Sequence, residues 1–384
     1  MAGGSLTIDG MGPAPAHIRA LSLRDFRNFE RLRLELPPPG LAIVGENGQG
    51  KTNLLEAMYY FSLLRSARGA RDVDVVRFDA AGFFIEAEAC VPEPQTLSIG
   101  FDRAGRRKRV RRNGAVVDRL SDALGALPAV MFSPADVELV SGAPGARRRY
   151  LDIMLALTSR GYLHALQQYR AALERRNAAL RSAAKQGREV SAGIEVWEPP
   201  LAEHGATIIR TRRAWVARVQ EGFAERCAAI GERLLMDLRY VTGVNANAES
   251  LELALGEALA AKRATDLRMG VTLVGPHRDD LGMLLAGREL RAFGSAGQQR
   301  TAAIALRMLE AETVREARGA SPVFLLDDPF AELDVRRATR VLKLLREIGF
   351  GQTILAVPRE GDIPPELTFL TRACVAGGRV DIDA

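Results

Sequence analysis

Apolar and polar residues alternate near the start of the chain in the pattern that strands require. Residues 17–23 and 31–36 place apolar side chains at about every second position, and this period of two predicts two short strands around a turn. The run Pro37-Pro-Pro-Gly ends the second strand, because proline cannot donate a backbone hydrogen bond to a sheet. Residues 41–44 are a short apolar run that leads through a glycine-rich turn into an apolar helix, predicted from about residue 52 to residue 64.

The pattern changes twice along the rest of the chain. Strands are predicted at residues 83–90 and in a hairpin at Asn113-Gly114, a dipeptide that favours the type I′ turn. From residue 146 to about residue 238, large apolar residues recur at helical spacing, and a break at residues 187–200 predicts a helical hairpin or small bundle. Strand-like alternation returns at Leu238, followed by a helix at 301–315, strands at 322–326 and 353–357, and a further helix between those strands.

This order of elements predicts an α/β fold in which a helical insert separates two α/β halves. The first fifteen residues are rich in Gly, Ala and Pro and lack the charged and apolar regions of a signal peptide, so we expect a disordered leader. No uncharged apolar stretch approaches the ~20 residues of a membrane span, and no membrane partner is expected. The predicted parts are the leader at 1–15, the first α/β part at 16–145, the helical arm at 146–245 and the second α/β part at 246–384.

Composition adds two constraints. The 53 basic and 47 acidic side chains leave a net charge of +6, which permits a polyanionic partner without requiring one, because most of the charge cancels. Only 5 of the basic residues are Lys and 48 are Arg, so a Lys at a chemically special position stands out. The three Cys residues are far apart and odd in number, which indicates a reducing compartment rather than a disulfide framework or a zinc cluster.

Residues 45–52 match the phosphate-binding loop G-x-x-x-x-G-K-[ST]. Glycines allow backbone N–H groups to point at phosphates, the following helix adds partial positive charge, Lys51 reaches the β- and γ-phosphates, and Thr52 ligates Mg²⁺. A plain glycine-rich turn is the alternative, and the strand before the motif and the helix after it argue against that alternative. The predicted nucleotide-binding residues are Gly45, Glu46, Asn47, Gly48, Gln49, Gly50, Lys51 and Thr52.

A second strand supplies the carboxylates that such a site needs. Four apolar residues, 323–326, end in Asp327-Asp328, as expected of a buried parallel strand that delivers Asp327 to Mg²⁺. Asp328 is then placed to orient or deprotonate a water molecule, and it is the predicted catalytic residue. Alone, this pattern would indicate a strand that ends in a polar turn. Together with the phosphate loop, it predicts a site for ATP and Mg²⁺.

A third segment, Phe293–Arg300, places Ser295 and Gly297 at the start of a predicted helix, which is another end suited to an anion. With the two motifs above, it resembles the signature motif of ABC-type ATPase heads, which lies on one protomer and caps ATP bound to the other. The resemblance implies that Ser295, Gly297 and Gln298 contact the ATP of a second copy. Gly294 stands where such heads usually carry Leu, and the order Ala296-Gly297 also departs from their pattern.

The spacing of the motifs separates the types of ABC-type head. Lys51 and Ser295 are 244 positions apart, farther than in transporter nucleotide-binding domains and much closer than in SMC heads with their long coiled coils. With further motifs included, the chain resembles the RecF family of bacterial recombinational-repair ATPases over nearly its whole length. These motifs are Leu23–Phe29, Phe132–Asp136, Gly142–Asp152, Arg175–Arg181 and Gly275–Leu281.

Two positions depart from the RecF pattern, and one segment departs from the pattern of many ABC-type ATPases. Ala135 stands where members usually have Glu, and Ala331 stands where they usually have Ser before Glu-Leu-Asp. After the last predicted strand, where many ABC-type ATPases place a His that senses the γ-phosphate, this chain has Val357-Pro358. This departure favours slow hydrolysis. His277 is a candidate substitute for the sensing His, and a hydrogen-bonded structural His is the commoner alternative.

Basic residues gather around the predicted Asn113-Gly114 hairpin. Such a hairpin either clamps a phosphate backbone or is a solvated, charge-rich surface. Aromatic residues do not interleave with the basic ones, so base stacking is not expected, and we expect readout of the duplex backbone and shape. The predicted DNA contacts are Arg106, Arg107, Lys108, Arg109, Arg111 and Arg112. The helical arm adds the basic residues Arg170, Arg175, Arg176, Arg181, Arg210, Arg212 and Arg213, some of which must pair with Glu174 or Glu203.

The RecF resemblance implies a function in recombinational repair, replication restart and the SOS response to DNA damage. ATP-bound dimers bind duplex, gapped or junction DNA and, with RecO and RecR, promote RecA loading, and slow hydrolysis resets the cycle. It also implies a cytoplasmic, nucleoid-associated protein. Two alternatives stay open: a transporter-type nucleotide-binding subunit, and a scaffold that binds ATP without turning it over.

Overall fold

The computed structural model describes residues 15–186, 193–245, 248–331, 333–349 and 351–382. The predicted leader at 1–15 lies outside this range except for its last residue. The chain divides into two compact units. We call residues 1–134 and 310–384 the sheet unit and residues 135–309 the helical unit, and each is described by itself.

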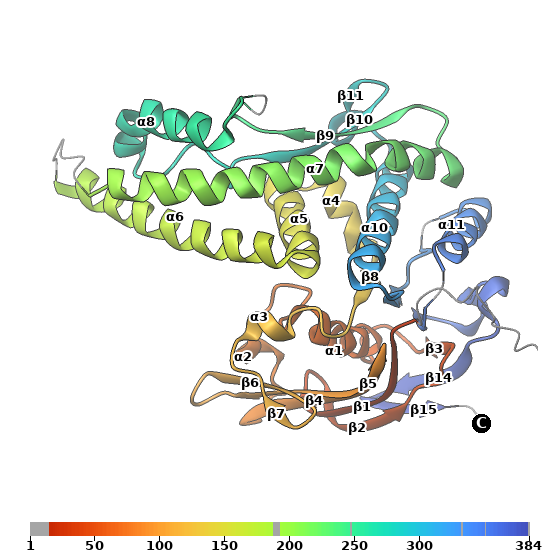
Figure 1. Cartoon of the computed structure of the whole chain (residues 1–384). Helices are drawn as coiled ribbons and strands as arrows, with labels where there is room; N and C mark the ends of the chain where they lie inside the picture. Colours follow the sequence, from red (N-terminus) through yellow and green to blue (C-terminus); the bar gives the residue numbers. More distant parts are fainter. Residues whose placement is uncertain (1–14, 187–192, 246–247, 332, 350, 383–384) are drawn as a thin grey trace, which may run out of the picture. The chain divides into compact units, whose positions relative to one another are not determined.

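The first sheet of the sheet unit has six antiparallel strands in the order β2-β1-β4-β5-β6-β7 (Figure 1). Buried and more exposed positions alternate along β4, which is the pattern of a sheet with one face on the core. The β6–β7 hairpin turns through Asn113 and Gly114, whose φ angles are 51° and 80°, as a type I′ turn requires. The strands are β1 (His17–Phe26), β2 (Phe29–Glu35), β4 (Gly82–Val91), β5 (Glu93–Asp102), β6 (Arg107–Arg112) and β7 (Ala115–Val116).

The second sheet has the order β15-β14-β3-β13-β12-β8 and is parallel except for its edge strand β15. Its central strands are continuous apolar runs buried along almost their whole length, as expected of parallel strands covered on both faces. The carboxyl ends of parallel strands meet at one edge, which therefore receives the loops after β3, β12 and β13. The strands are β3 (Gly40–Val44), β8 (Ala129–Phe132), β12 (Val323–Asp327), β13 (Thr353–Val357), β14 (Thr371–Ala376) and β15 (Arg379–Ile382).

Helix α1 (Lys51–Leu63) is buried along nearly all of its length and contacts strands of both sheets. The other helical elements of the sheet unit are short, apart from α11 and the end of α10 (Ala296–Arg318). They are α2 (Asp72–Val75), α3 (Leu120–Ala123), α11 (Val335–Ile348), and the 3₁₀ turns η3 (Glu360–Asp362) and η4 (Pro365–Leu367).

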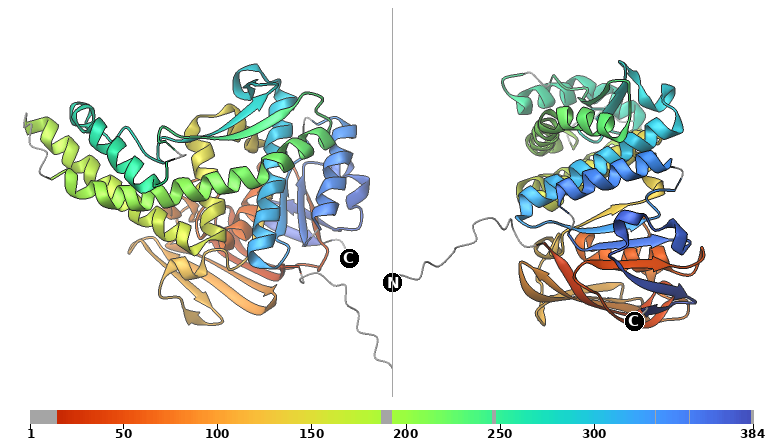
Figure 2. Two further views of the ribbon diagram at one scale, coloured as in Figure 1. Left: turned by 45° about the horizontal axis from the view of Figure 1, so that its top comes forward. Right: turned by 90° about the vertical axis from the view of Figure 1, so that its right-hand side faces the viewer.

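The helical unit contains two long helices, α6 (Arg160–Gln186) and α7 (Glu198–Ile230), which run side by side (Figures 1 and 2). They correspond to the two predicted helical runs. One continuous cluster of buried apolar residues, from Leu139 to Leu309, forms the core of this unit. The remaining elements are η1 (Pro134–Val137), α4 (Glu138–Ser141), α5 (Pro144–Thr158), η2 (Glu195–Trp197), β9 (Met236–Val241), α8 (Leu251–Met269), β10 (Asp280–Leu285), β11 (Arg288–Glu289), α9 (Leu290–Phe293) and α10 (Ala296–Arg318).

The boundaries of the two compact units differ from the domain boundaries predicted from the sequence. The helical unit begins at Ala135 and continues to Leu309, whereas the arm was predicted at 146–245. Strand β9 and helix α8 pack against α7, and residues of β9, β10 and α8 share its apolar core. Residues 246–309 therefore belong to the same compact unit as the long helices.

Candidate nucleotide site

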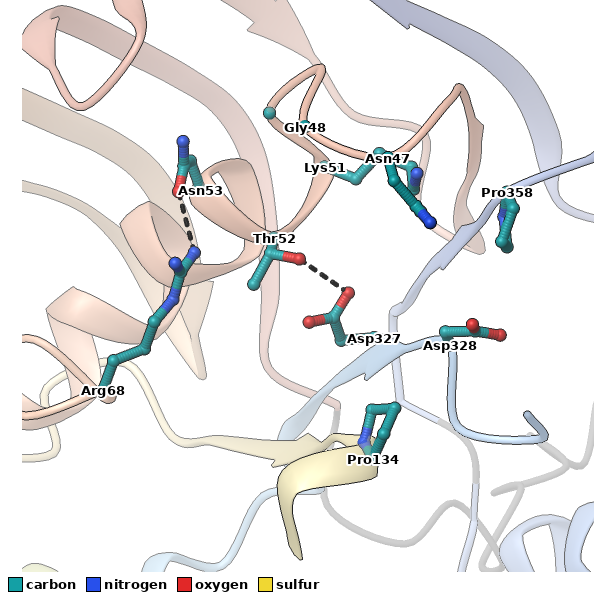
Figure 3. Close-up of a pocket in the computed structure, with 11 residues that line it drawn as sticks. Asn47, Gly48, Lys51, Thr52, Asn53, Arg68, Pro134, Asp327, Asp328 and Pro358 are labelled. Carbon is teal, nitrogen blue, oxygen red and sulfur yellow. Dashed lines mark hydrogen bonds between the residues drawn. The ribbon is translucent and has the colours of Figure 1, made fainter. Parts of the chain in front are cut away.

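The sheet unit contains a pocket of about 450 Å³ at the edge where the parallel strands end. The loop before α1, the start of α1 and Arg68 form one side, and the ends of β8, β12 and β13 with the residues after them form the other (Figure 3). The lining residues are Asn47, Gly48, Gly50, Lys51, Thr52, Asn53, Arg68, Pro134, Asp327, Asp328 and Pro358. Residues from two motifs predicted separately in the sequence thus lie in one pocket.

The phosphate loop has the backbone that its glycines predict. Gly48 and Gly50 have φ angles of 84° and 116°, which only glycine adopts readily. A Cβ atom on Gly50 would lie 2.5 Å from Nδ2 of Asn28, so a larger residue there would displace the Asn28 side chain. Asn28 donates a hydrogen bond to the carbonyl of Gln49 at 3.0 Å, and it thereby holds the loop against the turn between β1 and β2.

Lys51 begins helix α1 and is buried beneath the loop. Its ammonium donates to the carbonyl of Gly45 and, at 3.0 Å, to the carbonyl of Glu46. Burial lowers the pKa of Lys51, and the nearby carboxylates Asp327 and Asp328 oppose that effect. A cation held at the base of a helix N-terminus, beneath backbone N–H groups, is suited to the phosphates of a nucleotide.

Thr52 and Asp327 meet across the pocket, although they are 275 positions apart in the sequence. The Thr52 hydroxyl donates to Oδ1 of Asp327 at 3.0 Å (Figure 3). Burial raises the pKa of Asp327, and the hydrogen bond from Thr52 opposes that effect. A hydroxyl and a carboxylate are the hard oxygen ligands that Mg²⁺ prefers beside substrate phosphates, so the residues present fit this ion.

Asp328 follows directly after β12 and has a φ angle of 46°. Its N–H donates to the carbonyl of Ala356 at 2.8 Å, which fixes this left-handed conformation at the end of the strand. A non-glycine residue in this conformation is strained, and such residues cluster at functional sites. Figure 3 shows Asp328 on the side of Pro358, while the Asp327 carboxylate turns toward Thr52. The two neighbouring carboxylates are therefore directed to different parts of the pocket.

Arg68 is a pocket residue that the sequence analysis missed. It donates to Oδ1 of Asn53 at 2.7 Å and lies 3.6 Å from the buried carboxylate of Glu56. Arg27 donates to both oxygens of Glu56, each at 3.0 Å. Arg27 belongs to the family motif near the start of the chain, so that motif was a usable signal for a structural partner of α1.

The predicted signature residues belong to the helical unit and are not among the described residues that line the pocket. Ser295 accepts a hydrogen bond from the N–H of Gln298 at 3.3 Å, and its own N–H donates to Oε1 of Gln298 at 2.9 Å. This reciprocal pair caps the start of α10. Gln298 also donates to Glu232 at 3.3 Å. Glu332, in the segment after Asp328, lies outside the described residues.

Strand β6 separates its basic residues onto two faces. Arg107, Arg109 and Arg111 are exposed, whereas Lys108 is directed inward like the buried Val110. Lys108 pairs with Asp72 at 2.7 Å. The prediction that Lys108 contacts DNA therefore needs correction, because its ammonium already has partners inside the sheet unit. Within the described residues, no side-chain hydrogen bond or ion pair is formed by Arg106, Arg107, Arg109, Arg111 or Arg112.

Two arginines of the predicted arm, Arg176 and Arg212, are buried and pair with acidic residues other than the predicted Glu174 and Glu203. Arg176 is fully buried and donates to Asp266 at 2.7 Å, Thr272 at 2.8 Å and Glu198 at 3.0 Å. Arg212 donates to Asp152 at 2.6 Å and to the carbonyl of Pro276 at 2.8 Å. Both guanidinium groups serve the interior of the helical unit.

His277 has the environment of a structural histidine. Its Nε2 lies 2.9 Å from the carbonyl of Thr272, so this nitrogen carries the proton, and Nδ1 accepts from the Tyr169 hydroxyl at 2.6 Å. Burial lowers the pKa of His277 to about 4, although the hydrogen bond to Thr272 opposes this effect. A neutral imidazole with both nitrogens occupied is not a γ-phosphate sensor. At the pocket itself, Pro358 occupies the place after β13 where a sensing histidine was sought in the sequence.

Comparison with known proteins places these features in one family. The model of the RecF/RecN/SMC N-terminal domain matches residues 17–361. The DNA replication and repair protein RecF of Herpetosiphon aurantiacus is 36% identical over 95% of this chain and 99% of its own length. The protein of the same name from Frankia alni is 37% identical over the same shares.

Solved structures agree with the sequence relatives. A structure of the recombination mediator protein RecF-ATPrS in the RecFOR pathway has a TM-score of 0.88 and 29% identity, and the match covers 97% of this chain and 100% of that one. An SMC head domain from Pyrococcus furiosus has a TM-score of 0.55 at 17% identity over 96% of each chain, which supports the predicted ABC-type head fold. Among the helices of the described residues, none is long and apolar enough to cross a membrane.

Proposed function

The chain belongs to the RecF family of DNA replication and repair proteins, and from that premise we propose that it is an ATP-dependent DNA-binding switch. The observation that carries the proposal is the pocket in which the phosphate loop and Asp327 meet, with Thr52 bonded to Asp327 at 3.0 Å. A related RecF has been solved with ATP, and the arrangement of the phosphate loop and the carboxylates in this pocket supports the same ligand here.

In this proposal, the backbone N–H groups of residues 45–50 bind the phosphates, and Lys51 moves its ammonium from the loop carbonyls to the β- and γ-phosphates. Thr52 and Asp327 hold Mg²⁺, which supplies charge neutralisation at the γ-phosphate when bound. Asp328 orients the attacking water or accepts its proton. Ser295, Gly297 and Gln298 cap the ATP of a second copy, so that ATP drives dimerisation.

The exposed arginines of β6 and of the turn before it are the proposed DNA contacts. They are Arg106, Arg107, Arg109, Arg111 and Arg112, all exposed. Phosphate contacts of this type carry no base information, so duplex and gapped DNA bind without sequence preference. The family further supports RecO and RecR as partners, and through them RecA loading during recombinational repair, in the cytoplasm.

A scaffold that binds ATP without turnover is the second candidate. Pro358 lines the pocket after β13, and proline offers no side-chain group to sense a γ-phosphate. This observation favours slow hydrolysis and, at the limit, none. The transporter-type alternative has no comparable support, because the chain belongs to the RecF family.

Light scattering with ATP, Mg²⁺ and duplex DNA tests the proposal. We expect the molecular mass to double with ATP-Mg²⁺ and not with ADP-Mg²⁺, and the dimer to bind duplex. Asp328→Asn should keep the dimer and lower turnover at least about hundredfold, the order of a lost general base, whereas Asp118→Asn, at an exposed carboxylate, should change nothing. A wild-type mass that ATP does not change contradicts the switch. If the wild type and Asp328→Asn both show negligible turnover, the protein is a scaffold that binds ATP without hydrolysing it.

A further inference from the structure

Lys108 contacts both ends of residues 64–72, the segment between α1 and α2 that contains the pocket residue Arg68. We propose that Lys108 is a positioning residue for the nucleotide site, because it clamps residues 64 and 72 together and so fixes Arg68 against the pocket. This inference rests on the proposed binding of ATP and adds to it a residue far from the nucleotide motifs in sequence.

The two ends of the segment meet at one ammonium group. Nζ of Lys108 donates to the carbonyl of Leu64 at 2.7 Å and pairs with Oδ2 of Asp72 at 2.7 Å. Leu64 is the residue after α1, and Asp72 is the first residue of α2. The ammonium therefore joins the end of one helix to the start of the next.

The clamp is partly buried and has further partners. The side chain of Lys108 is 13% exposed, and its ammonium lies 5.3 Å from the centre of the Tyr60 ring. The Tyr60 hydroxyl donates to Oδ1 of Asp72, so both oxygens of this carboxylate have donors. Charge-assisted bonds in a partly desolvated site are the stronger kind. Removal of the ammonium would leave the Asp72 carboxylate beside the Leu64 carbonyl, and two acceptors repel each other.

The middle of the segment is attached to the pocket. Ser66 donates to the buried carboxylate of Glu56, and the N–H of Ala70 donates to the Ser66 hydroxyl at 3.3 Å. Arg68, between them, lines the pocket and donates to Asn53, another pocket residue, at 2.7 Å. The contacts of Ser66 and Arg68 therefore hold the Arg68 guanidinium at the pocket, and Lys108 holds the two ends of the same segment.

A double-mutant cycle separates positioning from general structural support, because two residues that act through one group give non-additive effects. The variants are Lys108→Met, Arg68→Gln and the two combined. Arg31→Met is the matched control, since Arg31 is an exposed basic residue on β2 of the same sheet. The measurements are the affinity for ATP-Mg²⁺ by titration and the thermal unfolding midpoint of each variant.

We expect each single substitution to weaken ATP-Mg²⁺ binding about tenfold, or ~1.4 kcal/mol. The double variant should also lose about tenfold rather than hundredfold, and Arg31→Met should bind as wild type does. Affinities that multiply to a hundredfold loss, or a Lys108→Met or Arg68→Gln variant with wild-type affinity, would overturn the proposal.

If Lys108→Met does not fold, Asp72→Asn replaces it in the cycle. The amide keeps the shape of Asp72 and removes the charge that Lys108 neutralises, so a loss of about threefold that vanishes in the Arg68→Gln background supports the clamp. An equal loss in both backgrounds contradicts it. Absence of ATP binding in the wild-type protein would instead refute the proposed function itself.

Discussion

The nucleotide pocket and the interior of the helical unit hold charged side chains in opposite ways. In the pocket, Lys51, Asp327 and Asp328 line an open space of about 450 Å³. In the helical unit, Arg176 and Arg212 are enclosed by carboxylates, hydroxyls and carbonyls of the same chain. The pocket residues and Arg176 lie in segments that resemble motifs of the family, so a motif identifies chemistry in one place and packing in the other. The charged side chains of the nucleotide pocket border open space, whereas those inside the helical unit do not, and this difference distinguishes a functional motif from a structural one.

The buried network also explains why the helical unit depends on charged residues at its core. Asp266 is fully buried and accepts from Arg176 at 2.7 Å and from the N–H of Leu273 at 3.1 Å. Asp152 accepts from Arg212 at 2.6 Å and from the Tyr162 hydroxyl at 2.6 Å. These groups join α5, α6 and α7 to the chain that follows α8. Removing one charged member of this network would leave the opposite charges buried without their partner.

The largest effect is expected from breaking that network. Arg176→Met should lower the free energy of unfolding by about 3–5 kcal/mol, because Asp266 and Glu198 would remain buried without their cation. Arg175→Met, at the exposed neighbour that stacks on Trp197 at 5.1 Å, should cost only about 0.5–1 kcal/mol. Denaturant unfolding measures both. A cost below about 1 kcal/mol for Arg176→Met would mean that the network is not a stabilising core.

His277 should make the unfolding free energy of the helical unit depend on pH in the acidic range. Its pKa of about 4 in the folded chain lies below the usual 6.5, so the unfolded chain binds the proton more readily between these pH values. Stability is therefore lost as the pH falls from 6.5 to 4, by up to roughly 3 kcal/mol. His277→Gln should remove this part of the pH dependence of the unfolding free energy. Identical pH profiles for the two proteins would show that the imidazole is not buried.

The exposed arginines of β6, unlike the buried ones of the helical unit, are predicted to bind DNA phosphates. Their replacement should change DNA affinity by a smaller amount. Each DNA phosphate that an arginine no longer neutralises should reduce the slope of log affinity against log salt by ~0.9 for B-DNA. Replacing Arg107, Arg109 and Arg111 with Ser should therefore lower the slope for duplex of any sequence. Arg33→Ser is the control, because Arg33 lies in the same sheet and pairs with Glu88 at 3.4 Å. An unchanged slope in the triple variant would make this face a solvated surface only.

Local patterns in the sequence predicted the elements whose chemistry is local. The phosphate loop, the strand before Asp327 and the Asn113-Gly114 hairpin each depend on a few neighbouring residues, and the structure has all three. The inward direction of Lys108 was also readable, because residues 108 and 110 share a face in a period-two strand and Val110 is apolar.

Long-range packing set the remaining features. Arg68 reaches the pocket through contacts with Asn53 and Glu56, and nothing in its own neighbourhood marks it as a pocket residue. Arg176 and Arg212 occur in arginine-rich helices and look like surface residues until their partners, Asp266 and Asp152, are placed in space. Residues 246–309 join the helical unit through an apolar core. No linker or change of composition in the sequence predicts that this segment belongs to the helical unit.

The affinity of Lys51→Met for ATP-Mg²⁺ tests the central claim most directly, namely that the open pocket of the sheet unit is the nucleotide site. Loss of the cation beneath the loop removes charge-assisted hydrogen bonds worth about 1.5–3 kcal/mol each. Titration should therefore show an affinity at least about hundredfold lower, with an unfolding midpoint close to that of the wild type. An affinity within about threefold of wild type, the scale of one weak contact, would contradict the assignment of this pocket.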